Sequence, residues 1–272
     1  MKRFFQIILL LTLSVVFLSG CSKFKKIQKS ADMDKKYEAA VAYYNNKEYY
    51  KALMLMEELV TIYRGSSKGE MALYYFAKSY YKTDDLISAA YYFETFTKTY
   101  GNSPFAEECA YLIAYCNYLQ SPKSSLDQES SYEAIRQFQL FINHYPNSSY
   151  IKECNAHIDE LYAKLEEKEF NSALMYYKMQ DYKASIVALS NIIKDHPQTA
   201  NKQQCLYLIA KSSYIYAFKS IETKQKERFE AALGNCKQYL ENFPDGKENA
   251  EVKELLARSE KFLLKLAEQK KI

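Results

Sequence analysis

The chain has 272 residues, of which 48% are hydrophobic and 26% are charged, and its 37 Lys and Arg nearly balance 33 Asp and Glu. This balance, with the two signs interspersed, argues against nucleic acid as a partner, because nucleic-acid-binding domains carry a clearly basic face. Only six Gly and five Pro are present, so turn-forming residues are too few for a many-stranded sheet, and helices are favoured.

The first twenty residues are typical of a cleaved export signal. Lys2 and Arg3 give a positive start, and residues 4–18 carry no charge. This apolar run is shorter than the roughly 20 residues that a membrane-spanning helix needs. Small residues precede Cys21, as a peptidase that binds an extended chain requires. We therefore predict a signal peptide over residues 1–20.

The tetrapeptide Leu18-Ser19-Gly20-Cys21 resembles the bacterial lipobox. The resemblance implies that Cys21 is the lipid anchor: it receives a diacylglycerol on sulfur and, after cleavage, an acyl chain such as palmitate on its amine. Several acyl chains hold a protein on a membrane more firmly than one. Ser22, rather than Asp, follows the cysteine, which is similar to proteobacterial lipoproteins that are exported to the outer membrane. We expect the protein to face the periplasm; an ordinary secreted protein with a chance cysteine is the alternative.

Residues 21–32 are expected to form a lipidated tether. The basic run of the chain lies here and comprises Lys23, Lys25, Lys26 and Lys29. Anionic head groups attract lysines near a membrane surface. The simple interpretation is therefore a flexible segment close to the membrane.

A recurring pattern occupies the rest of the chain. Clusters with Gly or Pro separate apolar helical segments, because these residues end one helix while Asn, Ser, Thr or Asp begins the next. The clusters are Tyr63-Arg64-Gly65, Tyr100-Gly101-Asn102-Ser103, Tyr145-Pro146-Asn147-Ser148, His196-Pro197-Gln198-Thr199 and Phe243-Pro244-Asp245-Gly246. They predict five pairs of helices.

Matching residues recur within the pairs. The first helix carries an alanine and, four residues later, a tyrosine: Ala40/Tyr44, Ala77/Tyr81, Ala114/Tyr118, Ala173/Tyr177 and Ala210/Tyr214. The second helix carries a small residue: Ala52, Ala89, Ala134, Ser185 and Ala232. Two helices approach closely only where side chains are small, so these residues are predicted to lie at the helix crossings.

This arrangement resembles the tetratricopeptide repeat, which implies an all-α superhelix of about five helix pairs with a C-terminal capping helix. Repeats 1–3 are expected over residues 33–147, and repeats 4 and 5 with the cap over residues 148–272. Three departures from a strict period are predicted: an insertion at 121–125, an added helical segment at about 149–166, and a lengthened fifth repeat near 218–226. The capping helix is expected at about 248–270.

Five cysteines remain besides Cys21. Equivalent positions on neighbouring helices are about 10 Å apart, which exceeds the reach of a disulfide. Cys109, Cys154 and Cys205 occupy the position held by Ala72 and Val252 in other repeats, and Cys236 the position of Met56 and Phe93. We therefore expect buried free thiols that behave as small hydrophobic side chains.

No sequence pattern typical of catalysis, a cofactor or a metal is found. The chain has no Gly-rich phosphate loop, no Gly-x-Ser-x-Gly, no His-Glu-x-x-His and no Cys-x-x-Cys. His144 and His196 fall at predicted helix ends, where a capping role is expected. We predict that the protein is not an enzyme and binds no cofactor or metal.

Tyrosine is unusually abundant, with 27 Tyr and no Trp. The first helices carry aromatic pairs seven residues apart, a spacing of two turns that places both rings on one face. In tetratricopeptide arrays this face is concave, and tyrosine offers a ligand a rigid apolar ring with a polar hydroxyl. The candidate peptide groove comprises Tyr37, Tyr44, Tyr74, Tyr81, Tyr111 and Tyr118. Packing between repeats is the alternative role for these residues.

The lipobox, the short basic segment and five helix pairs together resemble the BamD family. The most similar stretches are residues 165–199, residues 141–150 and the segment 121–132. The resemblance implies a non-enzymatic outer-membrane scaffold that binds a BamA-type barrel subunit, largely through its C-terminal repeats. It also implies that the N-terminal repeats receive C-terminal segments of unfolded outer-membrane proteins. The long fifth repeat and last helix depart from the family pattern, which leaves the partner interface open.

Two other classes of periplasmic repeat lipoprotein share this fold and anchor. One is a secretion pilotin or a cell-wall adaptor, which differs only in its partner. The other is a glycan-binding lipoprotein of nutrient uptake, against which the absence of Trp and the short chain argue.

Overall fold

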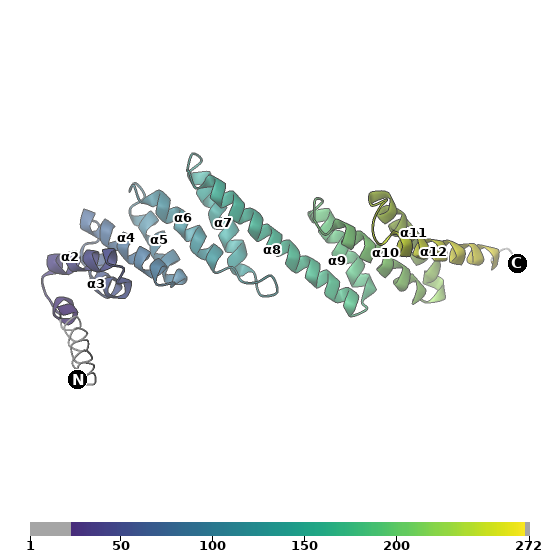
Figure 1. Cartoon of the computed structure of the whole chain (residues 1–272), viewed down its shortest axis with the longest axis horizontal. Coiled ribbons are helices and arrows are strands. Elements are labelled where there is room, and N and C mark those ends of the chain that lie inside the picture. Colours follow the sequence, from purple (N-terminus) through teal and green to yellow (C-terminus); the bar gives the residue numbers. More distant parts are fainter. Residues whose placement is uncertain (1–22, 270–272) are drawn as a thin grey trace, which may run out of the picture. The chain divides into compact units, whose positions relative to one another are not determined.

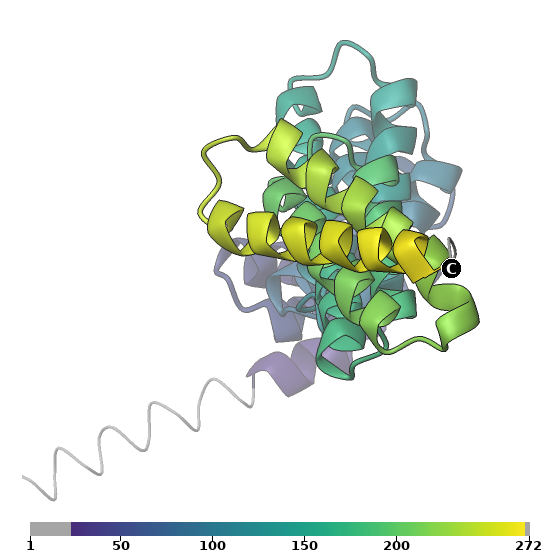
Figure 2. The ribbon, with the colours of Figure 1, turned by 90° about the vertical axis from the view of Figure 1, so that its right-hand side faces the viewer.

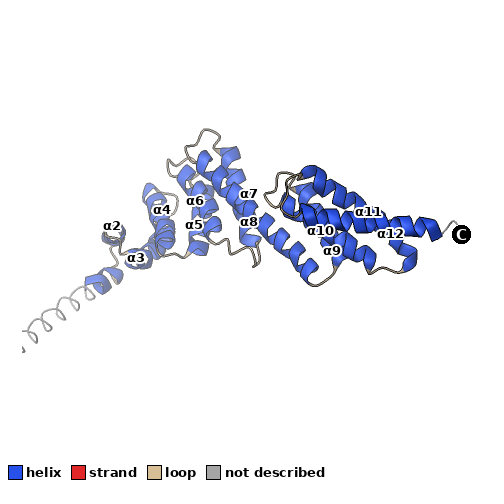
Figure 3. Cartoon of the chain, turned by 45° about the vertical axis from the view of Figure 1, so that its right-hand side comes forward, coloured by secondary structure: helices blue, strands red, loops and turns tan. Residues whose placement is uncertain are grey.

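The computed structural model describes residues 23–269, and these residues form helices and turns without a strand (Figure 3). The predicted signal peptide and Cys21 lie outside the described residues. Within 23–269, no helix combines the length and apolar character that crossing a membrane would require.

The described chain forms two compact units. The first contains the residues through Pro122 together with Leu126–Leu161, and the second contains Lys123–Ser125 and the residues from Tyr162 onward. The first unit holds α2 (Met33–Asn45), α3 (Tyr49–Ile62), α4 (Ser67–Lys82), α5 (Leu86–Thr99), α6 (Ala106–Leu119) and α7 (Glu129–His144). The second holds α9 (Tyr182–Asp195), α10 (Lys202–Phe218), α11 (Glu222–Asn242) and α12 (Asn249–Gln269), while α8 (Ile151–Lys178) contributes to both (Figure 1).

Helices that follow one another in sequence pack side by side from α2 to α7 in the first unit and from α9 to α12 in the second. The small residues predicted at the crossings have no exposed surface: Ala40, Ala52, Ala77, Ala89, Ala114, Ala134, Ala173, Ser185, Ala210 and Ala232. Large side chains such as Phe93, Phe138 and Leu189 fill the space beside them and are equally buried. The all-α architecture of helix pairs predicted from the sequence is confirmed.

The turn between the two helices of a pair has a fixed geometry in repeats 1, 2 and 4. Its last residues include one with a positive φ, namely Lys47 at 62°, Asp84 at 63° and Gln180 at 62°. An aspartate then caps the second helix in two of these repeats, where Asp85 accepts from the backbone N–H of Ser88 and Asp181 from that of Ala184. The turn therefore uses left-handed backbone without glycine.

The added segment expected at about 149–166 is not a separate helix. Helix α8 runs without interruption from Ile151 to Lys178, so the added segment and the first helix of repeat four are one element of 28 residues. The physical reason lies in its composition, since it contains neither Gly nor Pro and residues 165–169 are all strong helix formers.

The carboxyl-terminal helices lie where the sequence predicted them. The lengthening of repeat five lies in α11, which has 21 residues, and the predicted last helix is α12. In Figure 2 the yellow α12 crosses in front of α11, and α12 packs on both α11 and α10. Val252, Leu255 and Ser259 form its buried face.

The segment after the predicted anchor differs from the flexible tether that its lysines suggested. Residues 23–28 are helical, and the side chain of Phe24 is only 8% exposed. An aromatic residue among lysines gains from burial on the neighbouring repeat, and this fixes the segment to the first unit.

The five cysteines are free and fully buried, as predicted: Cys109, Cys116, Cys154, Cys205 and Cys236. Burial disfavours the charged thiolate. It raises the pKa of Cys109 and Cys116 to about 12, and that of Cys154, Cys205 and Cys236 to about 11.

Candidate peptide-binding surface

The six candidate tyrosines lie on α2, α4 and α6, the first helices of repeats 1–3. Tyr111 is buried, with 5% of its surface exposed. The other five are half-buried. Part of the surface of these five side chains therefore remains available to a ligand.

Tyr44 and Tyr74 belong to one aromatic row through Tyr75. The ring centroid of Tyr75 lies 4.7 Å from that of Tyr44 and 5.7 Å from that of Tyr74. Tyr74 in turn packs on Phe105, 4.5 Å away. Sequence reasoning missed Tyr75, although the Tyr74-Tyr75 doublet was a usable signal, since a doublet can reach both the groove and the preceding helix.

A second aromatic row surrounds Tyr111 and Tyr118. Tyr111 stacks on Tyr150 with centroids 4.3 Å apart, and Tyr118 lies 4.1 Å from the ring of His157. Tyr115 stands between them, 5.7 Å from each tyrosine. Tyr115 was also missed, because its position four residues after Tyr111 holds lysine in repeats 2 and 5.

Three of the candidate hydroxyls bind carboxylates of a following helix. Tyr74 donates to Glu108 Oε2 at 2.7 Å, and Tyr118 donates to Glu160 Oε2 at 2.6 Å. Tyr111 is hydrogen-bonded to Glu153. These bonds join successive repeats, which favours the packing role for the three tyrosines.

Glu108 also receives the ammonium of Lys78, with Nζ 2.7 Å from Oε1. Partial burial raises the pKa of the Glu108 carboxyl, but the hydrogen bonds from Lys78 and Tyr74 outweigh burial and hold that pKa below its usual value. The carboxylate therefore stays charged and keeps both donors.

The same three-residue arrangement recurs at the other end of the chain. Tyr207 donates to Glu251 Oε2 at 2.7 Å, and Lys211 Nζ lies 2.8 Å from Glu251 Oε1. Tyr and Lys are again four residues apart, and the glutamate again lies two helices further along the chain, on α6 for Glu108 and on α12 for Glu251. Because the same contact occurs at both ends of the chain, we infer that it stabilises the packing of the helices and is not specific to one ligand.

Tyr37, Tyr44 and Tyr81 differ from this group, because their hydroxyls make no hydrogen bond to a described residue. Burial raises the pKa of all three phenols, that of Tyr44 to about 12. Lys82 Nζ lies 5.4 Å from the ring centroid of Tyr81. These three residues combine apolar surface with unused hydroxyl groups, which suits the binding of an aromatic peptide.

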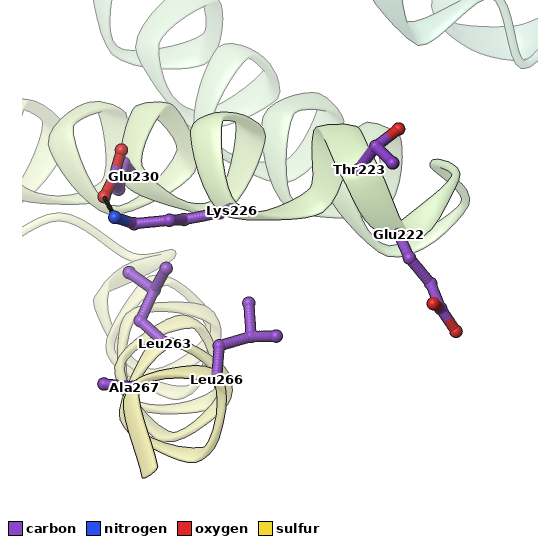
Figure 4. A pocket seen from close by; sticks show the side chains of 7 residues that line it. All are labelled: Glu222, Thr223, Lys226, Glu230, Leu263, Leu266 and Ala267. Carbon is purple, nitrogen blue, oxygen red and sulfur yellow. Dashed lines mark ion pairs between the residues drawn. The ribbon is translucent and has the colours of Figure 1, made fainter. Parts of the chain in front are cut away.

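A hollow lies in the carboxyl-terminal unit, between α11 and α12, and has a volume of about 730 Å³. Figure 4 shows its polar wall on α11, where Lys226 pairs with Glu230 at 3.7 Å, facing Leu263 and Leu266 on α12. The sequence predicted the lengthening of repeat five but not this hollow, because its apolar wall comes from the last turns of the capping helix.

Within residues 23–269, no group of three or more His, Cys, Asp or Glu side chains is placed to hold a metal ion. The described residues thus offer half-buried aromatic surface, paired charges and a partly apolar hollow between α11 and α12.

Comparison with known proteins gives a consistent result. The family model described as outer membrane lipoprotein, YfiO, matches residues 29–228 and 170–268. The outer membrane protein assembly factor BamD of Pasteurella multocida is 20% identical over 82% of this chain and 90% of its own length. BamD of Neisseria meningitidis serogroup A is 25% identical over 74% of this chain and 82% of its own. BamD of Haemophilus influenzae is 21% identical over 70% of this chain and 76% of its own length.

Among solved structures, the TPR domain of P58(IPK) is similar with a TM-score of 0.41 and 12% identity. The match covers 87% of this chain and 66% of the other.

Proposed function

The chain belongs to the YfiO family of outer membrane lipoproteins, and on that premise we propose that it is a scaffold of outer-membrane protein assembly that acts by binding rather than by catalysis. The observation that carries the proposal is its similarity to assembly factors named BamD over most of the length of both chains. Cys21 would anchor the scaffold in the outer membrane, with its repeats in the periplasm.

The amino-terminal unit is proposed to receive C-terminal segments of unfolded outer-membrane proteins. Tyr37, Tyr44 and Tyr81 offer half-buried rings whose hydroxyls are unused by the described protein. An aromatic residue at the end of such a segment can pack on these rings, and a terminal carboxylate can pair with Lys82, whose Nζ lies 5.4 Å from the ring of Tyr81. Together, the two contacts would give the peptide one buried apolar interaction and one charge pair.

The carboxyl-terminal unit is proposed to bind a BamA-type barrel subunit. The hollow between α11 and α12 presents Leu263 and Leu266 beside the acidic Glu222, and Lys226 also lines it, paired with Glu230. Such a surface suits an amphipathic segment whose apolar residues are flanked by basic ones. Exposed apolar surface continues on α12 at Leu264, which is 67% exposed.

The test is an affinity purification of the full-length acylated protein in mild detergent, with mass spectrometry of the proteins that co-purify in stoichiometric amount. We expect a subunit with periplasmic repeat domains followed by a β-barrel. Recovery of a secretion-pore subunit or a cell-wall enzyme instead would contradict the assembly role and support the pilotin or adaptor alternative. A matched purification of the Leu263→Glu, Leu266→Glu variant is expected to lose the barrel subunit while its helical content is unchanged.

A further inference from the structure

The segment that follows the predicted anchor is fixed to the first repeat through Phe24. Its ring meets Tyr43 of α2 edge-on, with centroids 5.6 Å apart. Phe24 belongs to the same buried cluster as Ala40, Leu55 and Met56, and Ile27 packs against this cluster. The segment is therefore part of the folded unit.

The connection from this segment to α2 is short and hydrogen-bonded. The backbone N–H of Lys29 donates to Lys25, that of Ser30 donates to Ile27, and that of Asp32 donates to Ser30 Oγ at 3.1 Å. Asp32 then caps α2 by accepting from the N–H of Lys35. No long loop separates the segment from the first repeat.

The polar side of the segment carries four lysines: Lys23, Lys25, Lys26 and Lys29. All four are exposed, and none forms a salt bridge with a described residue. The nearest acidic residues in sequence are already paired, because Asp32 binds Lys35 and Asp34 binds Lys68. The segment therefore presents uncompensated positive charge.

Chain length fixes how far this charge can lie from the anchor. Only two residues separate Cys21 from Phe24, and an extended chain spans at most about 3.6 Å per residue. The sulfur-bearing residue therefore stays within about 11 Å of a side chain that is buried in the first repeat. That distance is comparable to the Debye length of about 8 Å at physiological ionic strength, so acylation of Cys21 would bring the lysines within the field of charged head groups.

We propose that residues 23–29 form a second, protein-based membrane contact, in which Phe24 locks the segment to repeat one and the four lysines bind anionic phospholipid head groups. The proposal rests on the acylation of Cys21 that the proposed function includes. The contact holds repeat one, with its aromatic surface, at the membrane instead of leaving it on a free tether. Each lysine near an anionic surface strengthens binding about fivefold.

The test is a lysine footprint of the full acylated protein in vesicles of phosphatidylcholine alone and of phosphatidylcholine with phosphatidylglycerol. An amine-acetylating reagent marks accessible lysines, and mass spectrometry reads each site. We expect labelling of Lys23, Lys25, Lys26 and Lys29 to fall at least fivefold in the anionic vesicles and to recover in 1 M salt. The internal controls are exposed lysines of the second unit: Lys237, Lys253, Lys261 and Lys265.

The outcomes separate this proposal from the anchor itself. The mass of the amino-terminal peptide shows whether Cys21 is acylated, and an unmodified Cys21 would overturn both. An acylated protein whose four lysines label equally in both kinds of vesicle would overturn the membrane contact alone.

The docking of the segment is tested separately by amide hydrogen exchange on Phe24→Ala, with Phe24→Leu as the matched control. We expect the amides of residues 27–30 to exchange at least tenfold faster in Phe24→Ala and to be nearly unchanged in Phe24→Leu. Equal exchange in the parent and Phe24→Ala, with the other helices still protected, would show that the segment is not held by this side chain.

Discussion

Tyr74 on α4 donates a 2.7 Å hydrogen bond to Glu108 on α6, and this bond joins the second helix pair to the third. Lys78, one turn further along α4, reaches the other oxygen of the same carboxylate. A tyrosine on the expected ligand face thus also fixes the stacking of two repeats. Hydrogen bonds to a following helix assign the packing role to Tyr74, Tyr118 and Tyr111, and the proposed peptide-binding role is left to the other three tyrosines.

Replacing Glu108 by glutamine should destabilise the first unit at neutral pH. The pKa of Glu108 is held below its ordinary value of 4.5, so its carboxylate contributes stability above that value and loses it as pH falls through the lower, folded pKa. We expect Glu108→Gln to lower the unfolding free energy by about 1–2 kcal/mol at pH 7, and the difference to shrink below pH 4.5. Urea unfolding at pH 7 and at pH 3.5 measures this, with exposed Glu129→Gln as the control. A difference that does not change with pH would argue against the charged bond.

Replacing Tyr44 and Tyr81 together by alanine should weaken peptide binding. The probe is a synthetic decapeptide that ends in phenylalanine with a free carboxylate, and binding is measured by fluorescence anisotropy. We expect Kd to rise at least tenfold, because a packed aromatic contact contributes about 2 kcal/mol. Tyr91→Ala, on the exposed face of α5, should leave Kd unchanged. An unaltered Kd in the double variant, with unaltered helical content, would eliminate the groove.

Tyr74→Phe should lower stability without changing peptide binding, the opposite of what is expected for the Tyr44 and Tyr81 variant. It removes one hydroxyl that the protein itself uses, so we expect about 1 kcal/mol less stability and the same Kd for the decapeptide. Thermal unfolding monitored by circular dichroism measures the first quantity, and anisotropy the second. A large loss of peptide binding without loss of stability would instead assign Tyr74 to the ligand.

Lys47→Gly should stabilise the first repeat. Lys47 has a φ of 62°, a backbone conformation that costs a residue with a Cβ roughly 1–2 kcal/mol and costs glycine little. After the larger entropy of glycine in the unfolded chain is subtracted, we expect a gain of about 0.5 kcal/mol. Asn46→Gly, one residue earlier with φ −81°, should lower stability. Urea midpoints compare the two variants, and a loss in Lys47→Gly would contradict the expected relief of strain.

The five buried thiols should be inert in the folded protein. Burial raises their pKa values to about 11 or 12, which leaves little thiolate at pH 8. We expect Ellman's reagent to react with them at least a hundredfold more slowly in buffer than in guanidinium chloride. Rapid reaction of one thiol under native conditions would mark a repeat that opens locally.

The sequence predicted those features of the fold that are set by local patterns. The crossing residues, from Ala40 to Ala232, follow from spacing alone, because only a small side chain fits where two helices touch. The continuity of α8 was missed, although residues 165–169 lacked any helix breaker. Phe24 was overlooked because four lysines around it suggested solvent, whereas one buried ring decides the position of the segment.

The division among the tyrosines could not be read from the sequence. Tyr74 and Tyr81 hold equivalent-looking positions on one helix face, and only the neighbouring α6 determines that Tyr74 meets Glu108 while the hydroxyl of Tyr81 meets no described acceptor. Tyr115 was missed for a related reason, since its contacts with Tyr111 and His157 depend on how α6 and α8 pack.

For the export to the periplasm that the proposed function includes, the buried cysteines also bear on the order of events. Disulfides form readily in oxidising compartments such as the periplasm, and an unfolded chain exposes all five thiols to that chemistry. Helix pairs form from contacts close in sequence, which allows folding in microseconds to milliseconds, whereas disulfide formation takes seconds or longer. Because each thiol becomes hidden when its own and adjacent helices close, rapid local folding would protect an exported chain from mispairing.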